Sequence, residues 1–209
     1  MSATRPESHW ERMTRQNPAH STWYIQRFRD MRERGDDLDG EARCADAMVP
    51  RGSRILDAGC GPGRVSIALA DRGHTVTGID IDPVLIQEAQ RDAASRCLGQ
   101  PEFIVGDICT MSPQTVPGYP FDLIVCAGNV MTFLAEGTQR DALAAMCAVL
   151  APDGRAVVGF GTGRGYPADA FFVDIEDAGL RVENCFSTWD LRPWHDGGNF
   201  IVAVLGKAS

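Results

Sequence analysis

The stretch ILDAGCGPGR, at residues 55–64, constrains the fold of this chain more than any other stretch. Its apolar beginning runs into an acid, Asp57, and then into three glycines at alternate positions, Gly59, Gly61 and Gly63. A periodic apolar segment follows at once, so the pattern is that of a buried strand, a glycine turn and the start of a helix. Glycine is needed there because the backbone turns tightly and a ligand must approach closely. The stretch therefore predicts a ligand site.

The charge of Asp57 limits which ligand this turn can accept. The free N–H groups at the start of the helix offer donors to a polar ligand, but a carboxylate beside them repels a pyrophosphate and attracts a cationic amine or sulfonium. The dinucleotide fingerprint also requires a third glycine three residues after the second, and Arg64 stands at that position. Both observations argue against a nicotinamide or nucleotide-sugar oxidoreductase.

Composition excludes several classes of partner. With 209 residues and a net charge of −8, the chain lacks the basic face that nucleic-acid-binding proteins usually carry. The apolar runs are much shorter than the ~18–20 residues of a membrane span, and no basic-then-apolar leader opens the chain. The seven cysteines are scattered without a Cys-x-x-Cys pair, which favours reduced thiols and no metal site. We therefore expect a cytoplasmic protein that binds neither nucleic acid nor membrane.

The pattern of the remaining chain predicts two parts. Residues 1–50 are polar and broken, and we expect a helical cap that lies over the mouth of the part that follows. Residues 51–209 alternate between strands and helices, which predicts a Rossmann-like, doubly wound α/β sheet of seven strands with an antiparallel ending. Strands are expected around 54–57, 74–80, 101–107, 121–128, 154–163, 180–191 and 199–207. Helices are expected over 64–72, 83–97, 138–150 and 167–179, with Asp82 as the N-cap of the second and Pro152-Asp153-Gly154 stopping the third.

Four successive predicted strands end in polar or glycine-rich tips, at Asp57, Asp80, Asp107 and the run Ala127-Gly128-Asn129. In open sheets of this kind the carboxyl ends of the strands line a common crevice. At the end of the second strand, Asp80 is placed to accept both hydroxyls of a ribose. At the end of the third, Asp107 is placed to accept from an exocyclic amino group. Three carboxylates on three consecutive strand ends favour a ligand site over three unrelated turns.

These residues resemble the class I S-adenosylmethionine-dependent methyltransferases. The resemblance covers residues 53 to about 206. It is strong over 55–134, where ILDAGCGPG, GIDIDPVLI, VGDI and FDLIVCAGNVMTFL are similar to the first four motifs of the family. It implies S-adenosylmethionine as cofactor and S-adenosylhomocysteine as product. By that resemblance, the methionine end of the cofactor contacts Asp57, the Gly59-Cys60-Gly61 backbone, Ala127 and Gly128. The ribose contacts Asp80, and the adenine contacts Ile81, Asp107 and Ile108.

The same resemblance suggests what the N-terminal part contributes. In other members, aromatic residues and arginines near the N-terminus cover the cofactor and pair with its carboxylate. Here Tyr24 is the candidate for the first role and Arg43 for the second. The alternative for the aromatic residues of this part is that they pack the cap onto the sheet.

The segment after the fourth strand bears on the methyl acceptor. It lacks the (Asn/Asp)-Pro-Pro-aromatic run of enzymes that methylate nucleic-acid amino groups, and Cys126 follows Val125 where cytosine-carbon enzymes have a Pro-Cys pair. GNVMTFL is more similar to the small-molecule members. We therefore expect N- or O-methylation of a small molecule by in-line transfer, in a reaction whose main requirement is positioning and desolvation.

Two residues are candidates for contact with the acceptor. Asn129 is placed either to hydrogen-bond the acceptor or to cap the next turn, and His195, in RPWHDGG, is either a base or a solvated loop residue. The main alternative function is a non-catalytic S-adenosylmethionine-binding or regulatory protein. Aminopropyl transfer is disfavoured because acidic residues are lacking after the fourth strand. The identity of the acceptor atom and the choice between monomer and dimer stay open at this level.

Overall fold

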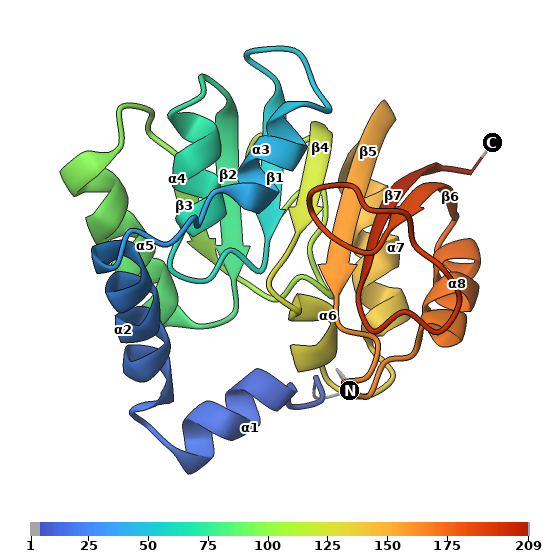
Figure 1. Ribbon diagram of the computed structural model, residues 1–209, viewed down its shortest axis with the longest axis horizontal. Coiled ribbons are helices and arrows are strands. Elements are labelled where there is room, and N and C mark those ends of the chain that lie inside the picture. The colour runs from blue at the N-terminus through green and yellow to red at the C-terminus, as the bar shows by residue number, and fades with distance from the viewer. Residues whose placement is uncertain (1–4, 209) are drawn as a thin grey trace.

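A mixed seven-stranded sheet forms the centre of the computed structural model, which describes residues 5–208 (Figure 1). The strand order is β3-β2-β1-β4-β5-β7-β6. The neighbours from β3 to β5 pair in parallel, whereas β7 pairs antiparallel with both β5 and β6. This confirms the predicted Rossmann-like sheet with its antiparallel ending. The strands are β1 (Arg54–Ala58), β2 (Thr75–Asp80), β3 (Glu102–Val105), β4 (Phe121–Cys126), β5 (Leu150–Phe160), β6 (Leu180–Phe186) and β7 (Ile201–Lys207).

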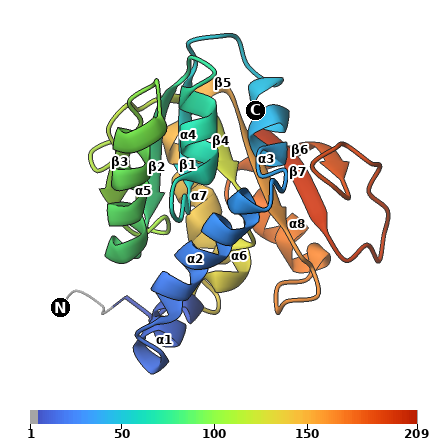
Figure 2. The same ribbon diagram turned by 60° about the vertical axis from the view of Figure 1, so that its left-hand side comes forward.

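Helices cover both faces of the sheet (Figure 2). On one face, α3 (Gly40–Asp46), α4 (Arg64–Ala70) and α5 (Pro83–Arg96) bury small and branched apolar residues against the strands. On the other face, α7 (Gln139–Val149) and α8 (Ala168–Asp177) contribute to the largest apolar cluster. Because both faces are covered, β4 is buried at every position but one and the last five residues of β5 are all buried, as expected for a parallel sheet.

Three further helices lie beyond the carboxyl ends of the parallel strands (Figure 1). They are α1 (His9–Gln16), α2 (His20–Glu33) and the short α6 (Val130–Phe133). We call α1 and α2 the cap helices. A capping box begins α1, where the Ser8 side chain accepts from the Glu11 N–H and the Glu11 carboxylate accepts from the Ser8 N–H. The expected position of the cap, over the end of the sheet that carries the strand tips, is the one observed.

The N-terminus of α5 matches the sequence prediction in detail. The Asp82 side chain accepts a hydrogen bond from the Val84 N–H at 2.8 Å, and Pro83 occupies the first helical position. Asp82 is also the residue that follows the strand end by two positions, so the helix cap and the tip of β2 are joined through a very short connection. This short connection places the Asp82 N–H within hydrogen-bonding distance of the Asp80 carboxylate.

Several predicted strand ends differ from the structure, and the largest difference is in the sixth strand, which ends at Phe186 rather than near residue 191. The third strand ends at Val105 rather than at Asp107, so Asp107 lies in the loop that follows it. The helix α7 ends at Val149, before Pro152-Asp153-Gly154, and these three residues belong to β5. Proline disfavours helical backbone in the residue before it, and the chain is already extended at Leu150. Leu150 pairs with Phe121, and an irregular register follows before the regular ladder between β4 and β5.

All seven cysteines lie within the described residues and are free thiols. Among residues 5–208, no helix is long and apolar enough to cross a membrane, and no group of three or more His, Cys, Asp or Glu is arranged to hold a metal ion.

Candidate functional site

A cavity of about 320 Å³ opens at the carboxyl ends of the first four strands. Most of the residues predicted to bind a ligand line it. These are Tyr24, Asp57, Gly59, Cys60, Gly61, Asp80, Ile81, Asp107, Ile108, Ala127 and Gly128. Side chains from the cap helices and from α6 line its other side. The crossover order of the sheet thus brings together residues that are up to about a hundred positions apart in the sequence.

The glycine turn between β1 and α4 is held by backbone hydrogen bonds. The N–H groups of Gly59 and Cys60 donate to the Ile79 carbonyl at 2.8 and 3.0 Å. Gly59 has a φ of 81°, and a Cβ atom there would lie 2.4 and 2.7 Å from the methyl carbons of Val130. Only glycine fits this contact, because a valine side chain on a helix has little freedom to move aside. Burial also raises the pKa of the Cys60 thiol well above its usual value, so the thiol stays neutral.

Asp57 is a buried acid at the tip of β1, only 2% exposed. Its Oδ2 accepts from the Ser66 hydroxyl at 2.6 Å. Burial raises the pKa of Asp57 to about 6, and the Ser66 hydrogen bond and the nearby Arg64 work in the opposite direction. A cationic group near this carboxylate would stabilise its ionised form, which burial disfavours.

Asp80, at the tip of β2, is oriented by two backbone N–H groups. Its Oδ2 accepts from the Gly61 N–H at 2.8 Å, and its Oδ1 accepts from the Asp82 N–H at 2.9 Å. Burial raises the pKa of Asp80 to about 6, and these two backbone bonds offset part of that effect. Each carboxylate oxygen can accept a further hydrogen bond. Asp80 is therefore oriented to receive two hydroxyl donors side by side.

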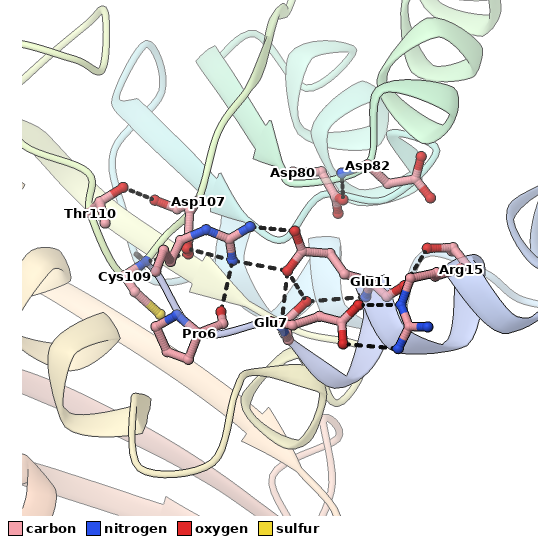
Figure 3. A network of polar contacts seen from close by, with 12 residues as sticks. Pro6, Glu7, Glu11, Arg15, Asp80, Asp82, Asp107, Cys109 and Thr110 are labelled. Atoms are coloured by element: carbon pink, nitrogen blue, oxygen red, sulfur yellow. Dashed lines mark hydrogen bonds and ion pairs between the residues drawn. The ribbon is translucent and has the colours of Figure 1, made fainter. Parts of the chain in front are cut away.

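Asp107 joins the N-terminal segment to the far end of the cavity (Figure 3). Its Oδ1 accepts from the Cys109 N–H at 2.9 Å, and its Oδ2 lies 3.2 Å from Nη1 of Arg5. The Arg5 guanidinium also pairs with the Glu11 carboxylate, and this contact holds the pKa of Glu11 at about 2. Arg5, which the sequence pattern did not indicate, thus belongs to the lining of the cavity together with Asp107.

Four aromatic side chains cover the cavity, and we call them the roof: Trp10, Tyr24, Phe28 and Phe133. The ring of Trp10 meets those of Tyr24 and Phe133 edge to face, at centroid distances of 5.2 and 5.6 Å, and Tyr24 meets Phe28 at 5.1 Å. Burial raises the pKa of the Tyr24 hydroxyl, which keeps the phenol neutral. Tyr24 therefore lines the cavity and also packs on the aromatic residues of the cap.

Arg43 does not line the cavity, contrary to expectation. It lies on α3 and is 53% exposed, and its guanidinium forms two hydrogen bonds with the Asp37 carboxylate at 2.8 and 2.6 Å. Besides Arg5, the arginine that lines the cavity is Arg64, at the first position of α4. The sequence carried a signal for it, because Arg64 replaces the third glycine of the dinucleotide fingerprint and so follows the turn directly.

Arg64 connects the glycine turn with the residues before β1. Its guanidinium forms a two-bonded pair with Glu41 of α3, at 2.8 and 2.7 Å, and donates to the Leu38 carbonyl. It also lies over the Phe28 ring at 5.6 Å from the centroid. With 15% of its side chain exposed, Arg64 holds α3, the roof and the turn in one arrangement.

The two residues predicted to contact an acceptor are not among those that line the cavity. Asn129 follows Gly128 directly, but its Oδ1 accepts from the Gly161 N–H at 2.8 Å, and its side chain makes no cap bond to α6. It therefore ties the ends of β4 and β5 together. His195 is exposed in the loop between β6 and β7. The loop joins β6 and β7, which form one edge of the sheet on the far side of β5 from β1.

The cavity offers three kinds of contact in sequence along the strand ends. The glycine turn and Asp57 form a polar, negatively charged end, and Asp80 presents paired acceptor oxygens. Asp107 lines the cavity together with the apolar Ile81 and Ile108. A sulfonium-bearing nucleoside matches this order of donors and acceptors, whereas a pyrophosphate would lie against Asp57. The residues present therefore fit S-adenosylmethionine.

Comparison with known proteins agrees with this fit. A family model described as a methyltransferase domain matches residues 55–154. Among solved structures, the chain is similar to a TehB-like SAM-dependent methyltransferase from Corynebacterium glutamicum. The two share 48% sequence identity and superpose with a TM-score of 0.84, over 91% of this chain and 100% of that one.

Two curated proteins are similar over shorter stretches. The S-adenosyl-L-methionine-dependent Diels-Alderase iccD of Talaromyces variabilis is 33% identical over 108 residues, which is 51% of this chain and 36% of that protein. The magnesium-protoporphyrin O-methyltransferase of Rhodobacter capsulatus is 42% identical over 89 residues, 43% of this chain and 38% of that protein. The chain thus spans little more than a third of the length of these two relatives.

Proposed function

The chain belongs to the S-adenosylmethionine-dependent methyltransferases, and we propose that it transfers the methyl group of that cofactor to a small-molecule acceptor. The observation that carries the proposal is the meeting of Asp57, Asp80 and Asp107 with the glycine turn on one cavity. The small size of this cavity and its aromatic roof support a small acceptor. So does the relative named as a magnesium-protoporphyrin methyltransferase.

We call Asp57, Asp80, Asp107 and the glycine turn, residues 59–63, the floor of the cavity. A role is assigned to each floor residue from its contacts. We infer that Asp57 and the turn hold the methionine end, that Asp80 accepts from the ribose hydroxyls, and that Asp107 accepts from the adenine amino group. Ile81 and Ile108 pack on the adenine, and Ala127 and Gly128 lie beside the methionine portion. No role in methyl transfer is assigned to Arg43 or His195.

When bound, S-adenosylmethionine supplies an electrophilic methyl group on a positively charged sulfur. The residues of the chain orient the cofactor and exclude water from the site. Asp57 places a negative charge near the cationic end, while Trp10 and Phe133 exclude water from the side opposite the floor. Such positioning and desolvation are the main sources of rate in an in-line transfer. Asn129, anchored on Gly161, shapes the rim where Gly128 meets α6.

Calorimetric titration with S-adenosylhomocysteine tests the cofactor assignment, with NAD as the control ligand. We expect micromolar binding of the first compound and none of the second. Binding of NAD, or of neither compound, would contradict the proposal. A protein whose Asp80 is replaced by alanine serves as the comparison, because it lacks the carboxylate assigned to the ribose and should bind more weakly.

Turnover separates the enzyme from a non-catalytic binding protein. Labelled S-adenosylmethionine is incubated with a panel of amines, phenols and small acids, and label is sought in the acceptor. Methyl transfer itself must be measured, because one relative is named as a Diels-Alderase that depends on the same cofactor. Tight cofactor binding without transfer to any acceptor class would favour the regulatory alternative.

A further inference from the structure

Asp82 is a buried acid just outside the cavity, and it contacts both the cap helices and the floor. It is 6% exposed. Its Oδ1 caps α5 by accepting from the Val84 N–H, while its Oδ2 accepts from the indole Nε1–H of Trp10 at 2.8 Å and from the Ser21 hydroxyl. Trp10 belongs to α1 and Ser21 to α2. One carboxylate therefore binds both cap helices to the start of α5.

The charge of Asp82 is satisfied by neutral donors. Within the described residues no arginine, lysine or histidine forms an ion pair with it, and three N–H or O–H groups face its two oxygens. A buried charge that relies on a few hydrogen bonds is sensitive to the loss of any one of them. Moving the cap helices away would remove two of these three donors.

A continuous line of hydrogen bonds runs from the cap to the floor. Trp10 and Ser21 donate to the Asp82 carboxylate. The Asp82 N–H donates to Asp80 (Figure 3), and the Gly61 N–H donates to Asp80 from the other side. The same Trp10 ring lines the cavity as part of the roof. Asp82 therefore influences both the position of the roof and the orientation of Asp80, the acid assigned to the ribose.

The other polar links between the cap and α5 are partly exposed ion pairs. Arg29 pairs with Glu88, and Arg32 pairs with Asp92 at 3.0 Å, with 42% of the Arg32 side chain exposed. The exposed Arg32 pair contributes little on average. Glu88 is buried, so its pair with Arg29 helps to hold α2 on α5, but neither residue lines the cavity. The apolar contacts of Trp10 and Ile25 with Leu85 add packing, but packing alone does not select the orientation of the indole N–H. Asp82 is therefore the polar contact that joins both cap helices to Asp80.

We propose that Asp82 is a positioning residue that couples docking of the cap helices to cofactor binding. Docking through Trp10 and Ser21 holds the Asp82 backbone, which orients Asp80, and at the same time closes the roof over the ligand. Since coupling of this kind is reciprocal, bound cofactor stabilises the docked cap to the same extent. The inference deepens the proposed function and rests on its cofactor assignment.

The variant Asp82→Asn breaks the cap contact and leaves the helix cap. Asparagine is as good an N-cap as aspartate, so its oxygen can keep the bond from the Val84 N–H. Its amide NH₂ then faces the Trp10 N–H, donor against donor. The Ser21 hydroxyl can rotate to accept, whereas the indole cannot. Trp10→Phe removes the same contact from the other side and leaves Asp82 unchanged, and Arg32→Gln is the matched control on the exposed part of the interface.

Binding of S-adenosylhomocysteine to these proteins is measured by calorimetry, and the rate of tryptic cleavage within the cap is measured with and without that ligand. We expect Asp82→Asn and Trp10→Phe each to weaken binding by about tenfold. We also expect them to lose most of the ligand-dependent protection of the cap, while the melting temperature of the rest of the chain stays close to wild type. The double variant should be no worse than Asp82→Asn, because the two changes remove one contact, and Arg32→Gln should match wild type.

Two results would overturn the coupling. One is wild-type affinity in Asp82→Asn or Trp10→Phe. The other is a lowered melting temperature in Asp82→Asn with cap protection by the ligand unchanged, which would make Asp82 a helix cap only. Failure of the wild-type protein to bind S-adenosylhomocysteine is a different result, because it removes the proposed function itself and the coupling with it.

Discussion

The floor and the roof of the cavity are built in different ways. The floor is held by backbone hydrogen bonds, from Gly59 and Cys60 to the Ile79 carbonyl and from Gly61 to Asp80. The roof is held by side chains, through edge-to-face aromatic contacts and the Trp10–Asp82 bond. The floor is therefore fixed by the sheet itself, whereas the roof depends on a few contacts between distant segments.

This difference predicts where changes are most damaging. A change in the floor alters a rigid frame and cannot be absorbed, so its effect should appear in both stability and ligand affinity. A change in the roof should appear mainly in ligand affinity.

Gly59→Ala should be the most damaging substitution in the floor. The added Cβ would stand 2.4 Å from a Val130 methyl carbon, at a backbone φ of 81°. We expect a loss of about 2–4 kcal/mol in the free energy of unfolding, measured by urea denaturation, together with loss of S-adenosylhomocysteine binding.

Gly35→Ala is the matched control for that substitution. Gly35 has a φ of 78°, but no atom lies within 4 Å of its added Cβ. It should show only the backbone term, on the order of 1 kcal/mol. Equal losses in the two variants would mean that the contact between the turn and α6 is not tight.

Asp80→Ala should weaken binding of S-adenosylhomocysteine by about 1–3 kcal/mol, the effect of leaving ribose hydroxyls unpaired. In the wild-type protein the affinity should also depend on pH. Since the pKa of Asp80 is raised to about 6, the acid becomes protonated as the pH falls below that value and loses acceptor capacity. Calorimetry between pH 5 and 8 (a range of about three units around this pKa) checks both effects. A pH-independent affinity would exclude an ionised Asp80 from the binding contact.

Asp57→Asn should stabilise the ligand-free protein above pH 6. The pKa of Asp57 is about 6 when folded and about 3.9 when unfolded. The folded wild type thus binds more protons in this window, and its stability falls as the pH rises from about 4 to 6. The variant lacks this loss and should gain about 1–2 kcal/mol at pH 8, while binding S-adenosylmethionine more weakly. The free energy of unfolding of both proteins is measured by urea denaturation at about pH 4 and at about pH 8. If the difference between variant and wild type is the same at both pH values, the charge of Asp57 is not buried.

Arg64→Gln and Arg43→Gln compare two arginines of the same neighbourhood. Arg64 is mostly buried against Glu41, whereas Arg43 is exposed beside Asp37. The first change should cost about 1–2 kcal/mol of unfolding free energy by leaving Glu41 unpaired, and it should weaken ligand binding. The second should stay within about 0.5 kcal/mol and leave binding unchanged. A loss of affinity confined to Arg43→Gln would restore the original expectation for Arg43.

The sequence predicted the floor well because its signals are local. A strand that runs into alternate glycines and an apolar helix has few other ways to fold. Asp57 and Asp80 lie at the carboxyl ends of β1 and β2, and Asp107 lies two residues beyond the end of β3. The rules of right-handed crossover then place those strand ends side by side. The predicted end of the third strand is wrong because nothing in the sequence Gly106-Asp107 shows that the pairing of β3 with β2 stops at Val105.

The roof and the rim could not be predicted in this way. The contact between Trp10 and Asp82 joins residues more than seventy positions apart, and nothing in the spacing around Trp10 distinguishes it from Trp23, which is exposed. The prediction that Asn129 and His195 contact the acceptor rests only on residue type and on position after a strand. The structure shows that Asn129 is engaged by Gly161 and that His195 lies on the loop beside the edge strands.

The sequence by itself determined the order of strands and helices, the glycine turn and the acids at the strand ends, because these depend on backbone conformation and periodicity within a few residues. The tertiary structure alone decided which arginine reaches the cavity, which aromatic rings cover it, and that Asp82 binds both cap helices. Those outcomes depend on how segments distant in sequence pack together. A side chain's type constrains what it can bind, but only packing determines which partner it meets.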